Sequence, residues 1–247
     1  MGKRILVRHR GKAGMQWLAP KKGKVAPVAY PAFDSASVRT GKVEAIVHER
    51  GRAAPLSRVS FADGSRSYLP AVAGLVVGQE LAFGSDAAPA VGNVLPLDRI
   101  PEGTAVCNIE KKFGDGGSIA RASGTSAVVF SQTGPTTVVR LPSGRSLFID
   151  SRARATIGAV AGGGTADKPF LTAGRRLRYM RSRGKAYPSV RGVAMAVVHH
   201  PFGGGRHQHP GKSTSTSRNA PPGRKVGHIA PRKTGRGRAQ RRGTVEQ

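Results

Sequence analysis

The stretch GKVEAIVH, residues 41–48, decides the fold because apolar and polar side chains alternate along it. Val43, Ala45 and Val47 would point to one side of an extended chain, and the residues between them to the other. Alternation over four to eight residues indicates a β-strand that is buried on one face. We therefore predict a strand here, and the fold depends on which segments pair with it.

Further short strands follow at intervals of about ten residues. The segment 56–61 is strand-like, Asp63-Gly64 is a hairpin signal, and residues 66–69 form the predicted return strand. The stretch GQELAFG, residues 78–84, adds another strand that ends at a glycine. This rhythm favours a small closed barrel, and we assign residues 36–84 to an oligonucleotide-binding-fold barrel.

A second series of strands occupies residues 85–170 and predicts an SH3-like barrel. Its strands are expected at 104–109, 127–130, 136–141 and 145–149, with turns at Thr133-Gly134-Pro135 and Pro142-Ser143-Gly144. Cys107 fits this barrel as a small buried apolar residue. The predicted fold class is therefore mainly β, with two successive barrels.

Two basic extensions flank the barrels. Residues 1–35 read as an extended arm because three prolines prevent a long helix, and we interpret Trp17, Tyr30 and Phe33 as occasional anchors rather than as a core. Residues 171–247 form the C-terminal extension. A short helix is predicted within 171–183, with Leu177 and Met180 on one side, and an irregular chain after Gly184.

The charge follows the same division. The chain of 247 residues has a formal net charge of +28, of which residues 1–30 contribute +8, residues 31–150 contribute +1 and residues 151–247 contribute +19. No carboxylate occurs between Lys168 and Val245. Segments of like charge repel themselves when they compact, so the flanks need a polyanion to order them. Arginine accounts for 28 of the 41 basic residues. Its planar guanidinium group can donate two hydrogen bonds to a phosphate and can stack on a base.

Composition excludes several classes of protein. The longest apolar run, near 71–77, is far shorter than the ~20 residues of a membrane helix, and the basic N-terminus does not resemble a signal peptide. A single cysteine allows neither an intramolecular disulfide nor a multi-thiolate metal site. We expect a cytoplasmic protein with no membrane partner.

Enzyme and metal motifs are incomplete. His48-Glu49-Arg50-Gly51-Arg52 begins like a zinc-protease motif, but arginine stands at the second histidine position. Gly211-Lys212-Ser213 has Arg206 where a phosphate-binding loop needs its first glycine. His199, His200, His207 and His209 cluster, yet no thiolate or carboxylate lies near them in the sequence. We expect no metal site and no catalytic residue.

The residues 192–205, GVAMAVVHHPFGGG, resemble the signature of the second large-subunit ribosomal protein family. The following RHQH at 206–209, APPGRKVG at 220–227 and RGR at 236–238 resemble its archaeal and eukaryotic branch, as do MGKRI at 1–5 and GAVAGGG at 158–164. The family usually has an acidic or amide residue before the signature histidine and an Asn-Pro pair upstream. This chain has His199 and Ala196-Val197 there, and His200 matches the signature histidine.

The resemblance implies a primary rRNA-binding protein of the large ribosomal subunit, with both barrels and with extensions threaded into rRNA. It implies a position near the peptidyl transferase region and support for subunit association, tRNA binding and peptide bond formation. The implied partners are large-subunit rRNA, other ribosomal proteins and the small subunit through an inter-subunit contact. It implies no cofactor beyond magnesium ions associated with the rRNA.

The candidate RNA-binding residues are basic side chains and the signature loop. The arm contributes Lys3, Arg4, Arg8 and Arg10. The segment beside the second barrel contributes Arg175, Arg176, Arg178, Arg181, Arg183 and Lys185. The tail contributes Arg191, His200, Gly203, Gly204, Gly205, Arg206, Lys212, Arg224, Lys225, Arg232, Lys233, Arg236 and Arg238. Arginine and lysine would neutralise phosphates, and glycines would let the backbone approach RNA closely.

Two other functions compete with this one. A free-standing RNA chaperone or nucleic-acid-compacting protein would share the charge but would not need two charge-balanced barrels between basic arms. A catalytic role has been proposed within the family for the signature histidine. General base catalysis needs a matched pKa and a fixed geometry, and the sequence shows neither for His200, so we expect a scaffold and not an enzyme.

Overall fold

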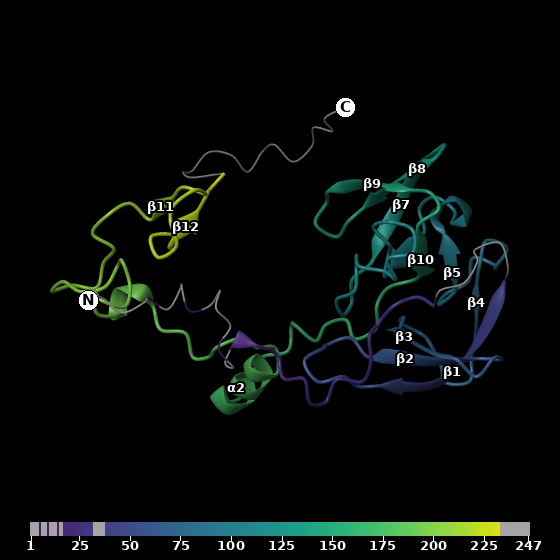
Figure 1. Cartoon of the computed structure of the whole chain (residues 1–247), viewed down its shortest axis with the longest axis horizontal. Coiled ribbons are helices and arrows are strands. Elements are labelled where there is room, and N and C mark those ends of the chain that lie inside the picture. The colour runs from purple at the N-terminus through teal and green to yellow at the C-terminus, as the bar shows by residue number, and fades with distance from the viewer. Residues whose placement is uncertain (1–4, 6–8, 10–13, 15–16, 32–37, 233–247) are drawn as a thin grey trace. The chain divides into compact units, whose positions relative to one another are not determined.

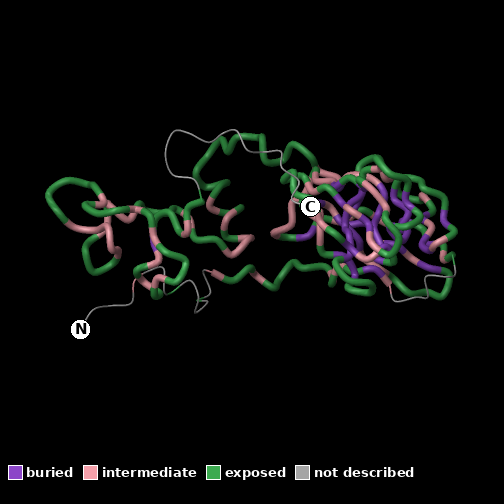
Figure 2. Tube along the Cα trace, turned by 90° about the horizontal axis from the view of Figure 1, so that it is seen from above, coloured by how far each residue is buried: buried purple, intermediate pink, exposed green. Residues whose placement is uncertain are grey.

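The computed structural model describes residues 5, 9, 14, 17–31 and 38–232, and it divides into two compact units (Figure 1). The barrel unit spans Lys21–Thr172, and the terminal unit combines Met1–Pro20 with Ala173–Gln247. Almost all buried residues belong to the barrel unit (Figure 2), and Val226 is the one buried residue among the described part of the terminal unit. The predicted domain boundaries at residues 35, 84 and 170 remain predictions.

Ten strands of the barrel unit form one continuous sheet, in the order β3-β2-β1-β4-β5-β10-β6-β7-β8-β9. The first five are β1 (Arg39–Val47), β2 (Leu56–Phe61), β3 (Arg66–Pro70), β4 (Glu80–Phe83) and β5 (Val94–Pro96). The 3-10 helix η2 (Leu97–Arg99) follows, and then come β6 (Ala105–Cys107), β7 (Ala127–Thr133), β8 (Thr136–Arg140), β9 (Ser146–Asp150) and β10 (Arg154–Ile157). The fold is mainly β, an oligonucleotide-binding-type barrel followed by an SH3-like barrel, as the strand rhythm predicted.

The first barrel is built on β1, the strand predicted at residues 41–48. β1 pairs antiparallel with both β2 and β4, and β2 continues into β3 through the predicted turn at Asp63-Gly64. The inward residues form one core: Tyr30, Val43, Val59, Phe61, Leu69, Leu81, Phe83 and Val94. Gly41 is a glycine because a Cβ there would lie 2.6 Å from Val59 Cγ1 and 2.9 Å from Phe61 Cε1. Two large side chains thus fill the space that β1 leaves open.

The second barrel depends on a strand that the sequence did not reveal. β10 pairs antiparallel with β5 on one side and with β6 on the other. It therefore joins two strands that both lie far from it in the sequence. All four of its residues, Arg-Ala-Thr-Ile, are buried, and no alternation marks them. Cys107 is buried, as predicted, in a small cluster with Ala54, Val72 and Val160. Burial raises the pKa of its thiol to about 12.

The interpretation of Tyr30 as an anchor outside any core was wrong. Its ring is 5% exposed within the first core. Its hydroxyl donates to Asn108 O at 2.8 Å and lies 2.6 Å from Thr156 Oγ1. Its backbone N donates to Gly116 O. The end of the arm is therefore an integral part of the barrel unit. The expectation for Phe33 lies outside the described residues.

A buried ion pair joins the strands of the second barrel to the arm. Glu110 is fully buried and pairs with Arg154, at 2.7 Å between Oε1 and Nη2. Its carboxylate also accepts hydrogen bonds from Arg154 N and Nε and from the backbone N of Gly114 and Gly116. Arg154 Nη1 donates to Pro31 O. One carboxylate thus organises a loop, a strand and the arm.

The terminal unit holds little regular structure. The predicted helix is present as α2 (Ala173–Ser182). The tail contains regular elements that were not predicted: a 3-10 turn η3 (Gly192–Ala194) begins the signature segment 192–205, and β11 (Ser215–Thr216) pairs in parallel with β12 (His228–Ile229). The rest of the described tail is irregular, as expected.

Candidate nucleic-acid interface

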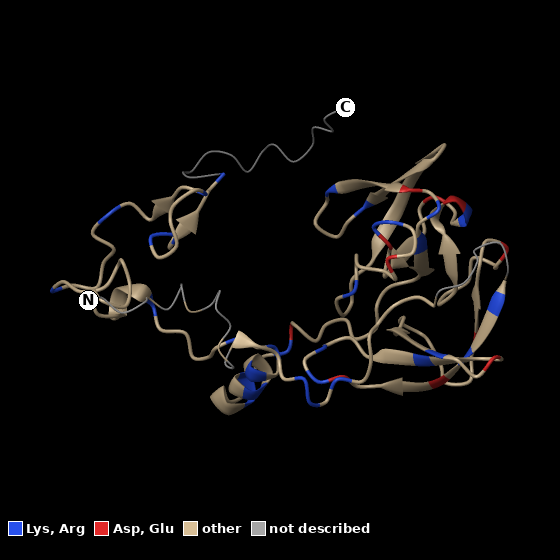
Figure 3. Cartoon of the chain, viewed as in Figure 1, with Lys and Arg blue, Asp and Glu red and all other residues tan. Residues whose placement is uncertain are grey.

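Helix α2 carries a row of exposed arginines, and none of its faces is buried against the rest of the protein. Arg175, Arg176, Arg178 and Arg181 are all exposed, and no residue of the helix is buried. Figure 3 marks lysine and arginine positions in blue along α2, whereas the acidic residues among those described all belong to the barrel unit. Like charges three residues apart on a helix repel one another. An anion bound along this row would remove that repulsion.

Two guanidinium groups near α2 are held by aromatic rings. Arg176 lies over the ring of Tyr187 at 5.1 Å from its centroid, and Arg183 lies over the ring of Tyr179 at 4.1 Å. Such cation–π contacts fix the direction of the guanidinium plane without neutralising its charge. The arginines thus keep the charge that a phosphate would neutralise.

The end of α2 is tied to the N-terminal arm. Lys185 N donates to Met180 O at 2.9 Å, and Gly184 has φ of 65°, which is the pattern of a glycine that ends a helix. A Cβ at Gly184 would lie 2.7 Å from Leu18 C. The backbone of the arm therefore packs directly on the helix end, and only glycine allows this approach.

The signature histidine is packed within its own loop. His200 Nδ1 accepts a hydrogen bond from Phe202 N at 3.0 Å, and the two rings contact each other with centroids 5.2 Å apart. A Cβ at Gly192 would overlap the imidazole, so the ring occupies the space that this glycine leaves. Burial lowers the pKa of His200. The loop thus holds a neutral imidazole whose Nδ1 is an acceptor.

The three glycines after Phe202 have two distinct roles. Gly204 and Gly205 have φ of 81° and 84°, which side chains rarely adopt. Gly203 is instead required by contact, because a Cβ there would collide with the carbonyl oxygens of Met195 and Ala196. Gly204 N donates to Met195 O at 3.0 Å. The loop is therefore folded back on residues 195–196.

The other predicted residues of the tail are spread along exposed loops. Arg191 donates to Gln208 Oε1 at 3.1 Å, which joins the two ends of the signature segment. From residue 191 onward, the exposed cations of the described tail are Arg191, Arg206, Lys212, Arg218, Arg224 and Arg232, and Lys225 is half-buried. The predicted Lys3, Arg4, Arg8, Arg10, Lys233, Arg236 and Arg238 lie outside the described residues.

The histidine cluster does not form a metal centre in the part of the chain that the structure describes. No three His, Cys, Asp or Glu side chains come together there in a way that could hold an ion. His200 Nδ1 is already engaged with the backbone of its own loop. None of the described helices is long and apolar enough to span a bilayer.

The family model for the C-terminal domain of ribosomal proteins L2 matches residues 90–225, which include most of the second barrel, α2 and the signature loop. The large ribosomal subunit protein uL2 of Cenarchaeum symbiosum is 52% identical over 98% of this chain and 100% of its own length. The proteins of the same name from Nitrosopumilus maritimus and Haloarcula marismortui are 51% and 49% identical, over 98% and 96% of this chain and 100% and 99% of their own lengths.

The chain belongs to the ribosomal protein L2 family. This confirms the resemblance that residues 192–227 indicated. The archaeal relatives match nearly the whole chain, so the arm and the barrels belong to the family together with the signature loop.

Sequence reasoning missed the polar side chains that shape this L2 family tail. Thr214 Oγ1 lies 3.1 Å from His228 Nδ1, and Thr216 Oγ1 donates to Val226 O at 2.7 Å, so these threonines join two segments of the tail. The alternation of serine and threonine in the run KSTSTS at 212–217 was the feature of the sequence that could have indicated strand β11. That run was interpreted as irregular because it contains no large apolar residue.

Proposed function

We propose that the protein is a structural constituent of the large ribosomal subunit and binds rRNA through its terminal unit and basic arm. Membership of the L2 family supports this, since the relatives are named as large-subunit ribosomal proteins. The observation that carries the RNA-binding part is the stretch between Lys168 and Val245, which contains no acidic residue and, as far as residue 232, exposes most of its cations. A surface of this kind needs an external polyanion.

The proposal assigns different tasks to the two units. The barrel unit contains all but one of the chain's 13 acidic residues and has its own cores, so it serves as a rigid base. The exposed arginines of α2 and the tail neutralise phosphates and release counterions, which gives affinity that does not depend on base sequence. The glycine-rich loops follow the shape of one folded RNA. Other ribosomal proteins are its further partners, and it resides on cytoplasmic ribosomes.

We further propose that the chain organises rRNA near the peptidyl transferase region and supports subunit association, tRNA binding and peptide bond formation. His200 acts in this scheme as a scaffold. Its Nδ1 accepts from Phe202 N and its ring fills the space beside Gly192, so its contacts explain why the loop needs an imidazole. The protein is not an enzyme in its own right.

The salt dependence of binding tests the proposal. The logarithm of affinity for large-subunit rRNA should fall linearly with the logarithm of salt concentration, by roughly 0.7 to 0.9 per neutralised phosphate. Replacing Arg175, Arg178 and Arg181 with Gln should reduce this slope by about two to three. Arg152→Gln is the control, because Arg152 is a 77% exposed barrel cation paired with Asp150. A flat salt dependence, or equal slopes for all variants, would contradict the electrostatic interpretation.

Co-sedimentation separates the ribosomal function from a free RNA chaperone. A subunit constituent stays with large subunits in sucrose gradients at high salt, because many contacts act together. A chaperone or nucleic-acid-compacting protein dissociates under the same conditions and binds unrelated RNA equally well. Loss from the subunit with undiminished binding to unrelated RNA would favour that alternative.

A further inference from the structure

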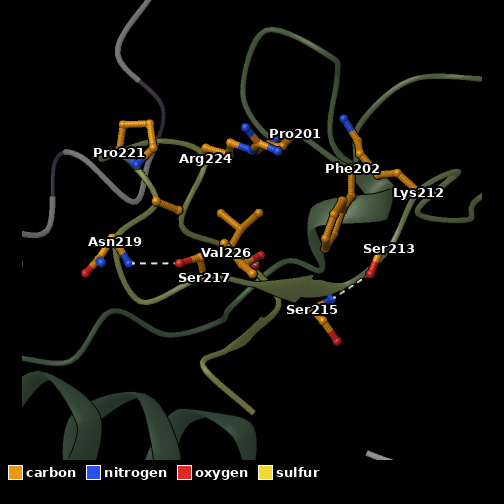
Figure 4. A pocket seen from close by; sticks show the side chains of 12 residues that line it. Pro201, Phe202, Lys212, Ser213, Ser215, Ser217, Asn219, Pro221, Arg224 and Val226 are labelled. Carbon is orange, nitrogen blue, oxygen red and sulfur yellow. Dashed lines mark hydrogen bonds between the residues drawn. The ribbon is translucent and has the colours of Figure 1, made fainter.

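A cavity in the terminal unit brings together residues of the signature segment 192–205, the segment 212–217 and the loop 219–226. Its volume is about 680 Å³, within the range of roughly 300 to 1,000 Å³ that is usual for small-molecule pockets. It lies between the segment 212–217, the loop 219–226 and the end of the signature loop at Phe202. Figure 4 shows Phe202 and Lys212 on one side of it, Ser217 and Asn219 on the other, and Val226 between them.

The shape of the cavity depends on the close approach of the backbone at Gly227 to the ring of Phe202. Gly227 has φ of 80°, and a Cβ there would lie 3.2 Å from Phe202 Cζ and collide with Thr214 O. The parallel pairing of β11 with β12 and the bond from Thr216 Oγ1 to Val226 O hold the two segments together. Val226 is buried behind them. The walls are thus defined by contacts within the terminal unit.

The lining combines an aromatic ring, hydroxyl groups and two cations. Ser213 Oγ accepts from Ser215 N at 3.3 Å, and Ser217 Oγ accepts from Asn219 N at 3.2 Å. Both hydroxyls therefore use a lone pair within the protein and keep their O–H hydrogen to donate. Lys212 and Arg224 add positive charge, and no lining residue is acidic. These donors and cations suit a phosphate and a sugar, and the ring suits a planar base.

We propose that this cavity receives one unstacked nucleotide of RNA, with its base against Phe202 and its phosphate between Lys212 and Arg224. The inference rests on the proposed function, because it names the element of RNA that the tail holds. Proteins recognise RNA by taking splayed bases onto aromatic rings and hydrogen-bonding the backbone and 2′-hydroxyl. The cavity has room for one nucleotide and not for a duplex.

The first test titrates the full free chain with three probes, AMP, adenosine and inorganic phosphate, and follows the isotope-labelled protein by NMR. AMP should give saturable shifts at Phe202, Ser213 and Ser217, and should bind more tightly than adenosine or phosphate. Phe202→Leu should weaken AMP at least fivefold and leave phosphate unchanged, since loss of one base–aromatic stack has about that effect or more. Arg224→Gln should weaken AMP and leave adenosine unchanged. Equal binding of AMP and phosphate, or no saturable shift, would overturn the proposal.

The second test measures affinity for large-subunit rRNA. Phe202→Leu should weaken binding at least fivefold with an unchanged salt slope, whereas Phe148→Leu should stay within twofold. Phe148 is the matched control because its ring is 75% exposed on the barrel unit. If the wild-type chain binds rRNA and Phe202→Leu binds equally well, the cavity inference fails and the proposed function stands. If the wild-type chain does not bind rRNA, the proposed function fails and the AMP titration alone decides the cavity.

Discussion

Replacing Glu110 with Gln should destabilise the barrel unit more than any surface change. The carboxylate is fully buried, and both of its oxygens accept: Oε1 from Gly116 N and Arg154 Nη2, and Oε2 from Gly114 N and from Arg154 N and Nε. A Gln amide in either orientation would place its NH₂ group against at least two donors. It would also leave the guanidinium of Arg154 without its counter-charge. Breaking a buried pair in this way costs about 3 to 5 kcal/mol.

The assay is urea unfolding of the full chain, followed by circular dichroism of its strands. With a slope of about 2 kcal/mol per molar urea, the midpoint should fall by about 1.5 to 2.5 M. Asp150→Asn is the control, because its pair with Arg152 is exposed at both ends and exposed ion pairs contribute little to stability. The double variant Glu110→Gln with Arg154→Met should recover part of the loss. A Glu110→Gln variant as stable as the control would refute the structural role assigned to this carboxylate.

Four further outcomes follow from particular contacts. His200→Gln should leave single-turnover peptidyl transfer on assembled ribosomes within a few fold, and a loss of about 10² to 10⁴ would identify a general base instead. In the free chain, an NMR titration should place the pKa of His200 below its ordinary value, because burial disfavours the charged ring. Gly192→Ala should weaken rRNA binding at least threefold because the added methyl overlaps the imidazole of His200, whereas Gly174→Ala, with open space around its Cα, should bind as the wild type does. Burial raises the pKa of both Tyr30 and Cys107, so the stability that they contribute is complete below their unfolded-state values of about 10 and 8.5 and declines as the pH rises above them. Urea midpoints should therefore fall between pH 9 and 12, and Tyr30→Phe should flatten the fall above pH 10; a midpoint independent of pH would contradict this.

Much of the site could be anticipated because its signals are local. The arginines of α2, the glycines of the signature loop and the absence of acidic residues are all visible in a short stretch of sequence, and their exposure or conformation follows from that stretch. The cavity could not be anticipated. Its walls come from Phe202, Ser213, Ser217 and Arg224, which meet only because Gly227 lets two segments approach.

The sequence by itself determined several of the strands, the hairpin turns between them and the charge division. Alternation in 41–48 and turn residues at 63–64 act between neighbours, so they predict β1 to β3 without knowledge of the rest. Only the tertiary structure decided which distant segments pair. β10 lacks alternation because it pairs with a strand on each edge and all four of its residues are buried. Tyr30 enters the core of the first barrel although it lies in a basic arm. Glu110 and Arg154 are 44 residues apart, and their attraction exists only once the loop after β6 and the strand β10 are adjacent.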